Sequence, residues 1–143
     1  MACKLKINPP NQGMSFLYNV TTHVGDARTC PNLPDDVQLV QFLIRELVPK
    51  FDATGGRKIQ ELPRLTGQFD ALTGFWIYNM QSSNEDIVTV DGIVSPAKGV
   101  MYGGKAWLIA GLNFKYKQFF PERFDKLHLH PELSPSLRAS LAA

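Results

Sequence analysis

Three histidines and one cysteine are the residues of this chain that most suggest metal chemistry. Imidazole is the commonest transition-metal ligand in proteins and a thiolate is another, so His23, His128, His130 and Cys30 form a candidate zinc set. The spacing of His128 and His130 places both rings on one face of a strand, but Pro131 follows at once and no HExxH or CxxC motif accompanies them. An exposed histidine pair is the preferred interpretation, and the sequence predicts neither a metal nor another cofactor.

Two pairs of neighbouring carboxylates raise the possibility of glycoside hydrolysis, which needs carboxyl groups about 5 to 10 Å apart across a cleft. Asp35 and Asp36 follow Pro34, where carboxylates stabilise the first turn of a helix, so capping explains them better. Glu85 and Asp86 lie in a polar run, where solvated charges are the default. Because no serine has a Gly-x-Ser-x-Gly setting and no cysteine has a recognisable histidine partner motif, the sequence predicts a protein that is not an enzyme.

Cations and aromatic rings alternate between residues 114 and 123, as on surfaces that bind single-stranded nucleic acid. The structural interpretation is preferred, because Tyr116, Phe119 and Phe120 have helical spacing and would pack inward while the lysines point outward. The run Gly55-Gly-Arg-Lys58 lacks the spacing and the preceding strand of a phosphate loop. We therefore expect no nucleic-acid partner.

Composition and charge limit the number of domains, the kinds of partner and the cellular location that can be expected. The 143 residues are 44% hydrophobic and 20% charged with a formal net charge of +2, which predicts one soluble domain over 1–143 and no footprint for anionic lipid. The apolar stretch 106–112 is far shorter than the roughly 20 residues of a membrane span, so no membrane contact is expected. Residues 8–11 are Asn-Pro-Pro-Asn where a signal peptide would be apolar, which predicts cytoplasmic synthesis and free thiols at Cys3 and Cys30.

The helices and strands that would position these residues are predicted from the spacing of apolar residues along the chain. A strand-like run covers 16–22, and a helix opens at Pro34 with an apolar stripe that should end before Pro49. The stripe consists of Val37, Val40, Leu43, Ile44 and Leu47. Residues 49–66 are expected to form a long connection with a short turn near 59–62.

A second helix is predicted from Asp70, ending in the polar run 81–85. Its predicted buried side consists of Leu72, Trp76, Ile77 and Met80. A short extended run at 87–90 then closes at the turn Asp91-Gly92. Ser95-Pro96 predicts a third helical segment through Leu112, with a break at 103–104, and Ser134-Pro135 opens a final helix to Leu141.

Three segments together resemble a known family. They are Asn32-Leu-Pro-Asp-Asp-Val-Gln-Leu-Val-Gln-Phe-Leu43, Gly67-Gln-Phe-Asp-Ala-Leu-Thr-Gly-Phe-Trp-Ile-Tyr-Asn-Met-Gln81 and Val90-Asp-Gly-Ile-Val-Ser-Pro-Ala97. In this order and spacing they resemble the peptidoglycan-binding-like domain family, a small three-helix module of cell-wall hydrolases and of phage and secretion-system proteins. The matching positions in the two helices are Asp36, Val37, Val40, Gln41, Leu43, Gly67, Phe69, Thr73, Ile77 and Gln81.

The pattern also has physical reasons of its own, and some positions depart from it. Glycine at 67 and 92 suits turns with positive φ, and Thr73 and Gln81 lie about two helical turns apart, so both can face one side. The departures are Thr66 for the family's Asp, Asp70 for Gly, Trp76 for a small residue and Met80 for Phe. A tryptophan at this position either closes the cleft between helices or forms a flat platform on which a sugar can stack.

The resemblance implies an all-α fold: a three-helix bundle over 32–100, with an N-terminal arm (1–31) and a C-terminal helical extension (101–143). It implies a non-catalytic protein that binds peptidoglycan or its stem peptide, by way of Gln68, Asp70, Thr73, Trp76, Asn79 and Asp91. The alternative is a structural adaptor that uses the same bundle for protein contacts in a phage or contractile secretion particle, which would also deliver the chain to the periplasm or cell wall. A metal-dependent cell-wall hydrolase is the less favoured catalytic reading, because the zinc peptidases that carry such a module have a separate catalytic motif without a counterpart here.

Overall fold

The fold combines a β-hairpin with helices. The computed structural model describes the whole chain except residues 1, 12, 56–60, 85–86, 88 and 103–104. The chain begins with the antiparallel strands β1 (Cys3–Asn11) and β2 (Met14–Asn19), followed by helices α1 (Pro34–Gly55) and α2 (Ala71–Ser82). The short antiparallel pair β3 (Met101–Tyr102) and β4 (Lys105–Ala106) comes next. Then follow α3 (Leu108–Phe119), α4 (Pro121–Phe124), the 3₁₀ helix η1 (Leu127–Leu129) and α5 (Pro135–Ala142).

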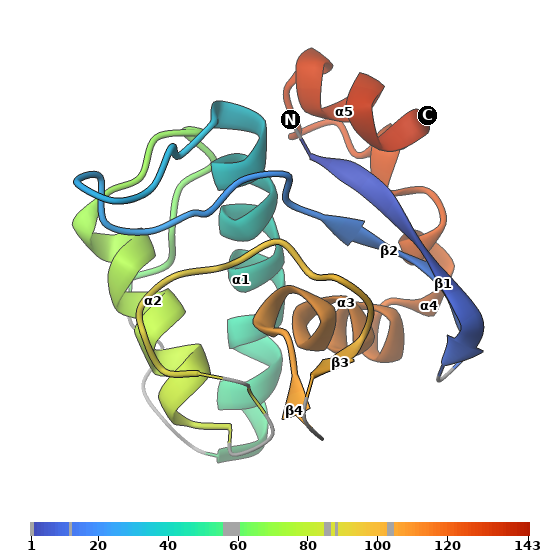
Figure 1. Ribbon diagram of the computed structural model, residues 1–143, viewed down its shortest axis with the longest axis horizontal. Helices are drawn as coiled ribbons and strands as arrows, with labels where there is room; N and C mark the ends of the chain where they lie inside the picture. Colours follow the sequence, from blue (N-terminus) through green and yellow to red (C-terminus); the bar gives the residue numbers. More distant parts are fainter. Residues whose placement is uncertain (1, 12, 56–60, 85–86, 88, 103–104) are drawn as a thin grey trace.

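Helix α1 forms the centre of the molecule, with α2 on one side and the hairpin and α5 toward the other (Figure 1). The predicted apolar stripe is confirmed, since its five side chains are fully buried. Leu39 and Phe42 are fully buried as well, so α1 is buried on nearly all sides over 36–44, as a central helix should be. Helix α3 packs against α1 and against β2.

The prediction that this helix ends before Pro49 is wrong, because α1 continues to Gly55. A proline within a helix removes one backbone hydrogen bond. Tertiary contacts on both sides of it favour the longer helix: Leu47 and Val48 are buried before the proline, and Phe51 contacts Phe119 after it.

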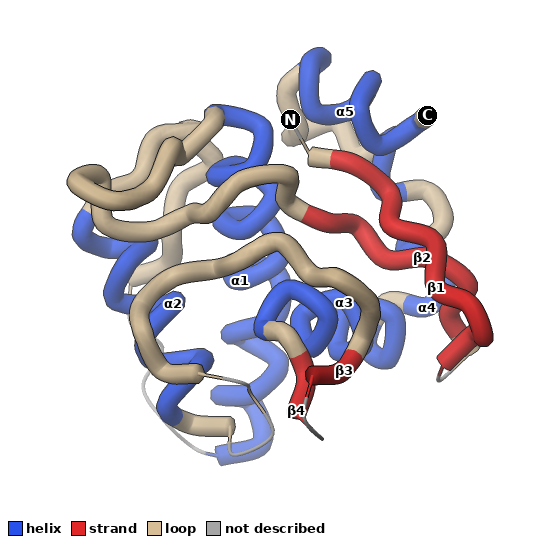
Figure 2. Tube along the Cα trace, viewed as in Figure 1, coloured by secondary structure: helices blue, strands red, loops and turns tan. Residues whose placement is uncertain are grey.

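The all-α fold class predicted from the sequence is also wrong, because β1 and β2 form a hairpin that belongs to the core (Figure 2). Leu17 and Tyr18 of β2 are fully buried. The Asn113 side chain of α3 accepts from the backbone N–H of Tyr18 at 2.7 Å and donates to its carbonyl oxygen at 2.8 Å, which satisfies β2 where no further strand pairs with it. Only β2 has a clear strand pattern, since Pro9 and Pro10 in β1 are unusual in strands.

The predicted helix opening at Ser95-Pro96 is a further error, because helix α3 begins only at Leu108, after β3 and β4. The buried Asn19 side chain explains the difference. Its Oδ1 accepts from the N–H of Ala97 and its Nδ2 donates to the carbonyl of Ala97, both at 3.0 Å. Both backbone groups of Ala97 are thus bound outside any helix, and residues 95–100 run as a loop.

The C-terminal segment packs onto the same core as the hairpin. The predicted helix after Ser134 is confirmed as α5, whose amino end is capped where the Ser134 hydroxyl accepts from the N–H of Leu137. Tyr18 donates its hydroxyl to the carbonyl of Phe124, which ties β2 to α4. Within the residues that the structure describes, no helix combines the length and the apolarity that crossing a membrane requires.

Candidate functional site

The buried Gln41 side chain organises the segment that enters α2. Its Nε2 donates to the carbonyl of Gln68 at 3.0 Å and to the Thr73 hydroxyl at 3.1 Å, and its Oε1 accepts from the N–H of Gly67 at 3.0 Å. Gly67 has a φ of 73°, so the positive φ expected of this glycine is confirmed. One amide therefore connects α1, the turn at 67–68 and α2.

Asp70 and Thr73 form the amino-terminal cap of α2. The Asp70 carboxylate accepts from the backbone N–H of Thr73 at 2.8 Å and from its hydroxyl at 2.6 Å, and Asp70 has the extended backbone of an N-cap residue. The predicted helix start is confirmed. Thr73 is fully buried, whereas Asp70 and Gln68 are exposed.

The second buried amide, Gln81, holds the turn after α2. Its Oε1 accepts from the N–H of Gly92 at 2.8 Å, and its Nε2 donates to the carbonyl of Ile93 at 2.9 Å and to the Asp91 carboxylate at 3.1 Å. Gly92 has a φ of 73°, so a positive φ is confirmed here too. Thr73 and Gln81 are both buried, so the prediction that they face the same side of the helix is correct.

The other two candidate residues of α2 are half-buried. The Trp76 indole N–H donates to the carbonyl of Glu61 at 2.8 Å, and the Asn79 amide donates to the carbonyl of Phe75 at 2.8 Å. Of the four residues predicted to line the buried side, only Ile77 is fully buried, while Leu72, Trp76 and Met80 are intermediate. All six candidates thus lie on α2 or beside its ends, and Asp70, Thr73 and Asp91 bind their polar groups to the chain itself.

Sequence reasoning missed two exposed aromatic side chains on the outer face of α2. The Phe75 and Tyr78 residues are 45% and 54% exposed. Residues 71, 75, 78 and 82 are all exposed and recur at helical spacing, a stripe that could have been identified opposite the buried positions 73, 77 and 81. The Phe75 and Trp76 rings meet edge to face with their centroids 5.3 Å apart. Large exposed rings on a helix surface suit contact with a ligand or partner.

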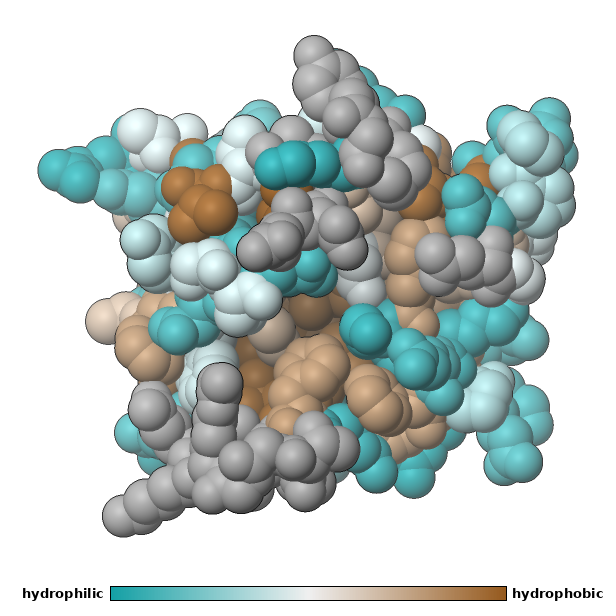
Figure 3. Space-filling view, turned by 90° about the horizontal axis from the view of Figure 1, so that it is seen from below, coloured by the Kyte–Doolittle hydropathy of each residue, from teal (hydrophilic) through white to brown (hydrophobic). Residues whose placement is uncertain are grey.

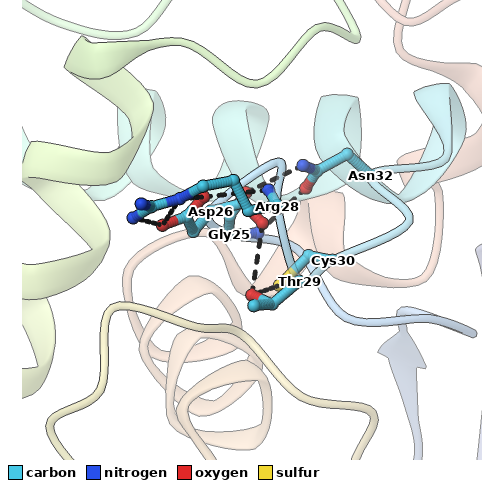
Figure 4. A network of polar contacts seen from close by, with 6 residues as sticks. All are labelled: Gly25, Asp26, Arg28, Thr29, Cys30 and Asn32. Atoms are coloured by element: carbon cyan, nitrogen blue, oxygen red, sulfur yellow. Dashed lines mark hydrogen bonds and ion pairs between the residues drawn. The ribbon is translucent and has the colours of Figure 1, made fainter.

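The loop between β2 and α1 is held in place by its own polar contacts (Figure 4). The Asn32 side chain accepts from the N–H of Gly25 and donates to its carbonyl, and Val24 and Val94 exchange backbone hydrogen bonds. At the tip the exposed Arg28 guanidinium binds Asp26, whose pKa falls to about 2 because of that hydrogen bond. The loop therefore presents a fixed ion pair rather than a free cation.

A small pocket lies where α3, α4 and η1 meet. Its volume is about 250 Å³, and its walls are Tyr116, Glu122, Arg123, Lys126, Leu127, Leu129 and His130. The Tyr116 pKa rises to about 12, mainly because the phenol is buried and also because Glu46 is near, so the hydroxyl remains protonated at neutral pH. The His130 Nδ1 accepts from the N–H of Glu132, which leaves Nε2 to carry the ring proton, 3.8 Å from a Glu46 carboxylate oxygen.

Apolar side chains also gather on a third face of the molecule. This face lies near the carboxyl end of α1 and near the β3–β4 pair. Figure 3 shows brown and tan surface around a hollow on this face. Phe51, near the carboxyl end of α1, is 37% exposed, and its ring meets that of Phe119 edge to face, with the centroids 5.9 Å apart. This face is a second candidate for contacts with another molecule.

The candidates for metal and acid–base chemistry lie apart from one another, and the buried His128 Nδ1 has no hydrogen-bond partner in the part of the chain that the structure describes. His23 Nδ1 shares a hydrogen bond of 3.0 Å with the Ser95 hydroxyl, and the His128 and His130 positions belong to η1 and its end. Among the described residues, no three His, Cys, Asp or Glu side chains gather as a metal site. Cys3 and Cys30 are free thiols, and burial raises the pKa of Cys3.

The carboxylate pair that opens α1 serves structural roles. The pair lies in the first turn of the helix, as predicted. Asp36 accepts from the backbone N–H groups of Thr21 and Thr22 at 3.0 Å each, whereas Asp35 accepts from the Ser136 hydroxyl at 2.8 Å. The two carboxylates therefore bind different segments, and the pair Glu85-Asp86 lies outside the described residues.

Comparison with protein-family models, with curated proteins and with solved structures finds no match to this chain.

Proposed function

We propose that this chain is a non-catalytic protein that binds peptidoglycan through the outer face of α2. The observation that carries the proposal is the pair of exposed rings on that face, Phe75 at 45% and Tyr78 at 54%. A sugar ring has apolar faces edged by hydroxyl groups, so a flat aromatic ring with polar neighbours suits a glycan strand. The half-buried Trp76 supports the Phe75 ring from the side.

The polar surroundings of these rings suit the peptide part of the same polymer. Gln68, Asp70 and Asp91 are exposed and flank the two ends of α2, and Asn79 directly follows Tyr78 in the sequence. These side chains and the backbone around them offer donors and acceptors for a stem peptide. Thr73 is fully buried, so its contribution is to fix the helix start through Gln41 and Asp70.

The resemblance noted in the sequence is the reason for proposing peptidoglycan as the ligand. The positions that carry it have definable structural tasks: Gly67 and Gly92 turn with positive φ, and Gln41, Thr73 and Gln81 satisfy the backbone around α2. A module that retained these tasks would present α2 in a fixed orientation. We further infer that the chain is made in the cytoplasm and reaches the cell wall inside a particle.

Sedimentation with purified sacculi, at low and high salt, tests the proposal. The double variant Phe75→Ala/Tyr78→Ala should bind about tenfold or more weakly, because both stacking surfaces are removed. Phe51→Ala is the matched control, since it removes an aromatic side chain of similar exposure from α1 and should leave binding unchanged. Circular dichroism of each variant verifies the fold.

Two results would overturn the proposal. One is an absence of saturable, salt-resistant binding by the unaltered chain. The other is equal binding by the double variant and the parent, because the aromatic face would then have no part in it. Release of soluble muropeptides from the sacculi would contradict the non-catalytic part, and addition of zinc or a chelator would show whether that release needs a metal.

A structural adaptor in a phage or contractile secretion particle is the second candidate, and the apolar face of Figure 3 favours it. Phe51 and Phe119 contribute aromatic surface where α1 and α3 end. If the chain binds an assembled particle through this face, Phe51→Ala should weaken that binding while Phe75→Ala/Tyr78→Ala should not. The same variants therefore separate the two functions.

A further inference from the structure

We propose that the pocket between α3, α4 and η1 binds a carboxylate carried on a small apolar body, as at the carboxyl end of a peptide. The pocket is formed by side chains outside α2, so this inference does not rest on the proposed function.

The charged side chains of the pocket favour an anion. Arg123 and Lys126 line it together with a single carboxylate, that of Glu122. No described carboxylate lies within ion-pair distance of either cation. Glu46, the other acidic group nearby, lies 3.8 Å from His130. A carboxylate entering the pocket would therefore meet two cations that the fold leaves available.

The Phe120 ring restrains Arg123. Its guanidinium lies over the Phe120 ring, 5.0 Å from the ring centroid. Stacking on an aromatic face restricts the guanidinium plane and leaves its edge, with several N–H donors, free to bind the two oxygens of a carboxylate. Lys126 adds a second, more flexible positive charge from the turn that follows α4.

The walls of the pocket select a ligand with an apolar part. The surface that lines it is mainly apolar, and Leu129 is an exposed apolar side chain of the lining, whereas Tyr116 and Leu127 are buried. Leu129 is 57% exposed, so its side chain offers apolar surface that a ligand can reach. The Tyr116 hydroxyl, protonated at neutral pH, adds a donor and no negative charge.

The volume of the pocket limits the size of its ligand. The volume of about 250 Å³ lies below the range of roughly 300 to 1,000 Å³ that is typical of sites for drug-sized molecules. One residue with its carboxylate fits such a space, and a long peptide would have to extend out of it. A short acid of the same shape offers the same chemistry, so the experiment must separate the two sources.

The experiment is a titration of the ¹⁵N-labelled full chain, followed by chemical-shift changes of the backbone amides. The probes are N-acetylalanine, its uncharged amide and isobutyrate. N-acetylalanine should shift the resonances of residues 122–130 saturably, and the amide should bind about tenfold more weakly because it lacks the charge. Tighter binding of N-acetylalanine than of isobutyrate assigns the site to peptide ends, and the reverse order assigns it to free short acids.

Charge variants complete the test. Arg123→Gln and Lys126→Gln should each weaken N-acetylalanine binding about fivefold to tenfold. Lys98→Gln, at an exposed lysine outside the pocket, is the matched control and should have no effect. Lys126 is exposed, so its variant should fold even if Arg123→Gln does not. The proposal is overturned if N-acetylalanine causes no saturable shift in the pocket, if the amide binds equally well, or if Lys126→Gln binds as the control does.

Discussion

The surroundings of α2 and the pocket beside α4 use polar side chains in opposite ways. Around α2, the amides of Gln41 and Gln81 bind backbone groups of the turns at 67–68 and 92–93, and the Asp70 carboxylate caps the helix. In the pocket, Arg123 and Lys126 face open space and have no carboxylate partner among the described residues.

The difference shows that residue type alone is a poor guide to a site. Gln, Asp and Thr near α2 have the types expected of a polar binding cleft, yet three buried members of that group, Gln41, Thr73 and Gln81, are used by the scaffold. What α2 offers to solvent is aromatic surface. Capacity for ionic binding lies instead in the C-terminal region, where sequence reasoning expected only packing and solvated lysines.

The largest expected effect on stability comes from removing the buried amide that holds the amino end of α2. Gln41→Leu keeps an apolar stem but leaves the Gly67 N–H and the Gln68 carbonyl without their partner. The free energy of unfolding should fall by about 3 kcal/mol, because each buried polar group left unsatisfied costs about 1 to 3 kcal/mol. Urea denaturation measures it.

The matched control for that variant is Gln118→Leu, at an exposed glutamine of α3. It should change the free energy of unfolding by less than about 0.5 kcal/mol. Equal effects of the two substitutions would mean that the buried amide does not hold α2 in place.

The next largest effect on stability concerns Tyr116, which lines the pocket, and it appears at alkaline pH. Burial raises the pKa of Tyr116 to about 12 in the folded chain, against about 10 for a solvent-exposed tyrosine. The contribution of this group to stability is therefore complete below pH 10 and is lost as the pH rises toward and through 12. We expect a loss of about 2 kcal/mol between about pH 9 and pH 12 from this group.

Tyr116→Phe isolates that contribution, since phenylalanine keeps the ring and cannot ionise. Tyr18, whose pKa burial also raises, remains in both proteins. Urea denaturation across this pH range should give a shallower decline for the variant than for the parent. Parallel curves would show that the Tyr116 hydroxyl is not buried in the folded protein.

The smallest effect sharpens the role of Asp70. Asp70→Ala removes the acceptor for the N–H of Thr73 and should lower the free energy of unfolding by about 1 kcal/mol. Asp70→Ser retains a capping oxygen and should stay within about 0.5 kcal/mol of the parent. If Asp70→Ser keeps its stability and loses binding to sacculi, Asp70 also contacts the ligand; if both are retained, its role is confined to the cap.

Patterns within short segments of the sequence correctly predicted those features that depend only on neighbouring residues. The apolar stripe of α1, the Asp70 cap of α2, the positive φ of Gly67 and Gly92 and the Ser134 cap of α5 each depend on residues a few positions apart, and all were predicted. The candidate residues of α2 were likewise found near one another. Their exposure was not predicted, because it depends on what packs against the helix.

The sequence by itself determined the start and the apolar stripe of the central helix and the caps and turns around α2, since 3.6-residue periodicity and capping act within short segments. Tertiary structure alone decided the rest. Asn113 and Asn19 bind backbone groups 95 and 78 positions away, which stabilises β2 and keeps residue 97 out of a helix. The pocket likewise exists only because α4 and η1 fold back against α3, bringing together side chains whose proximity no local pattern encodes.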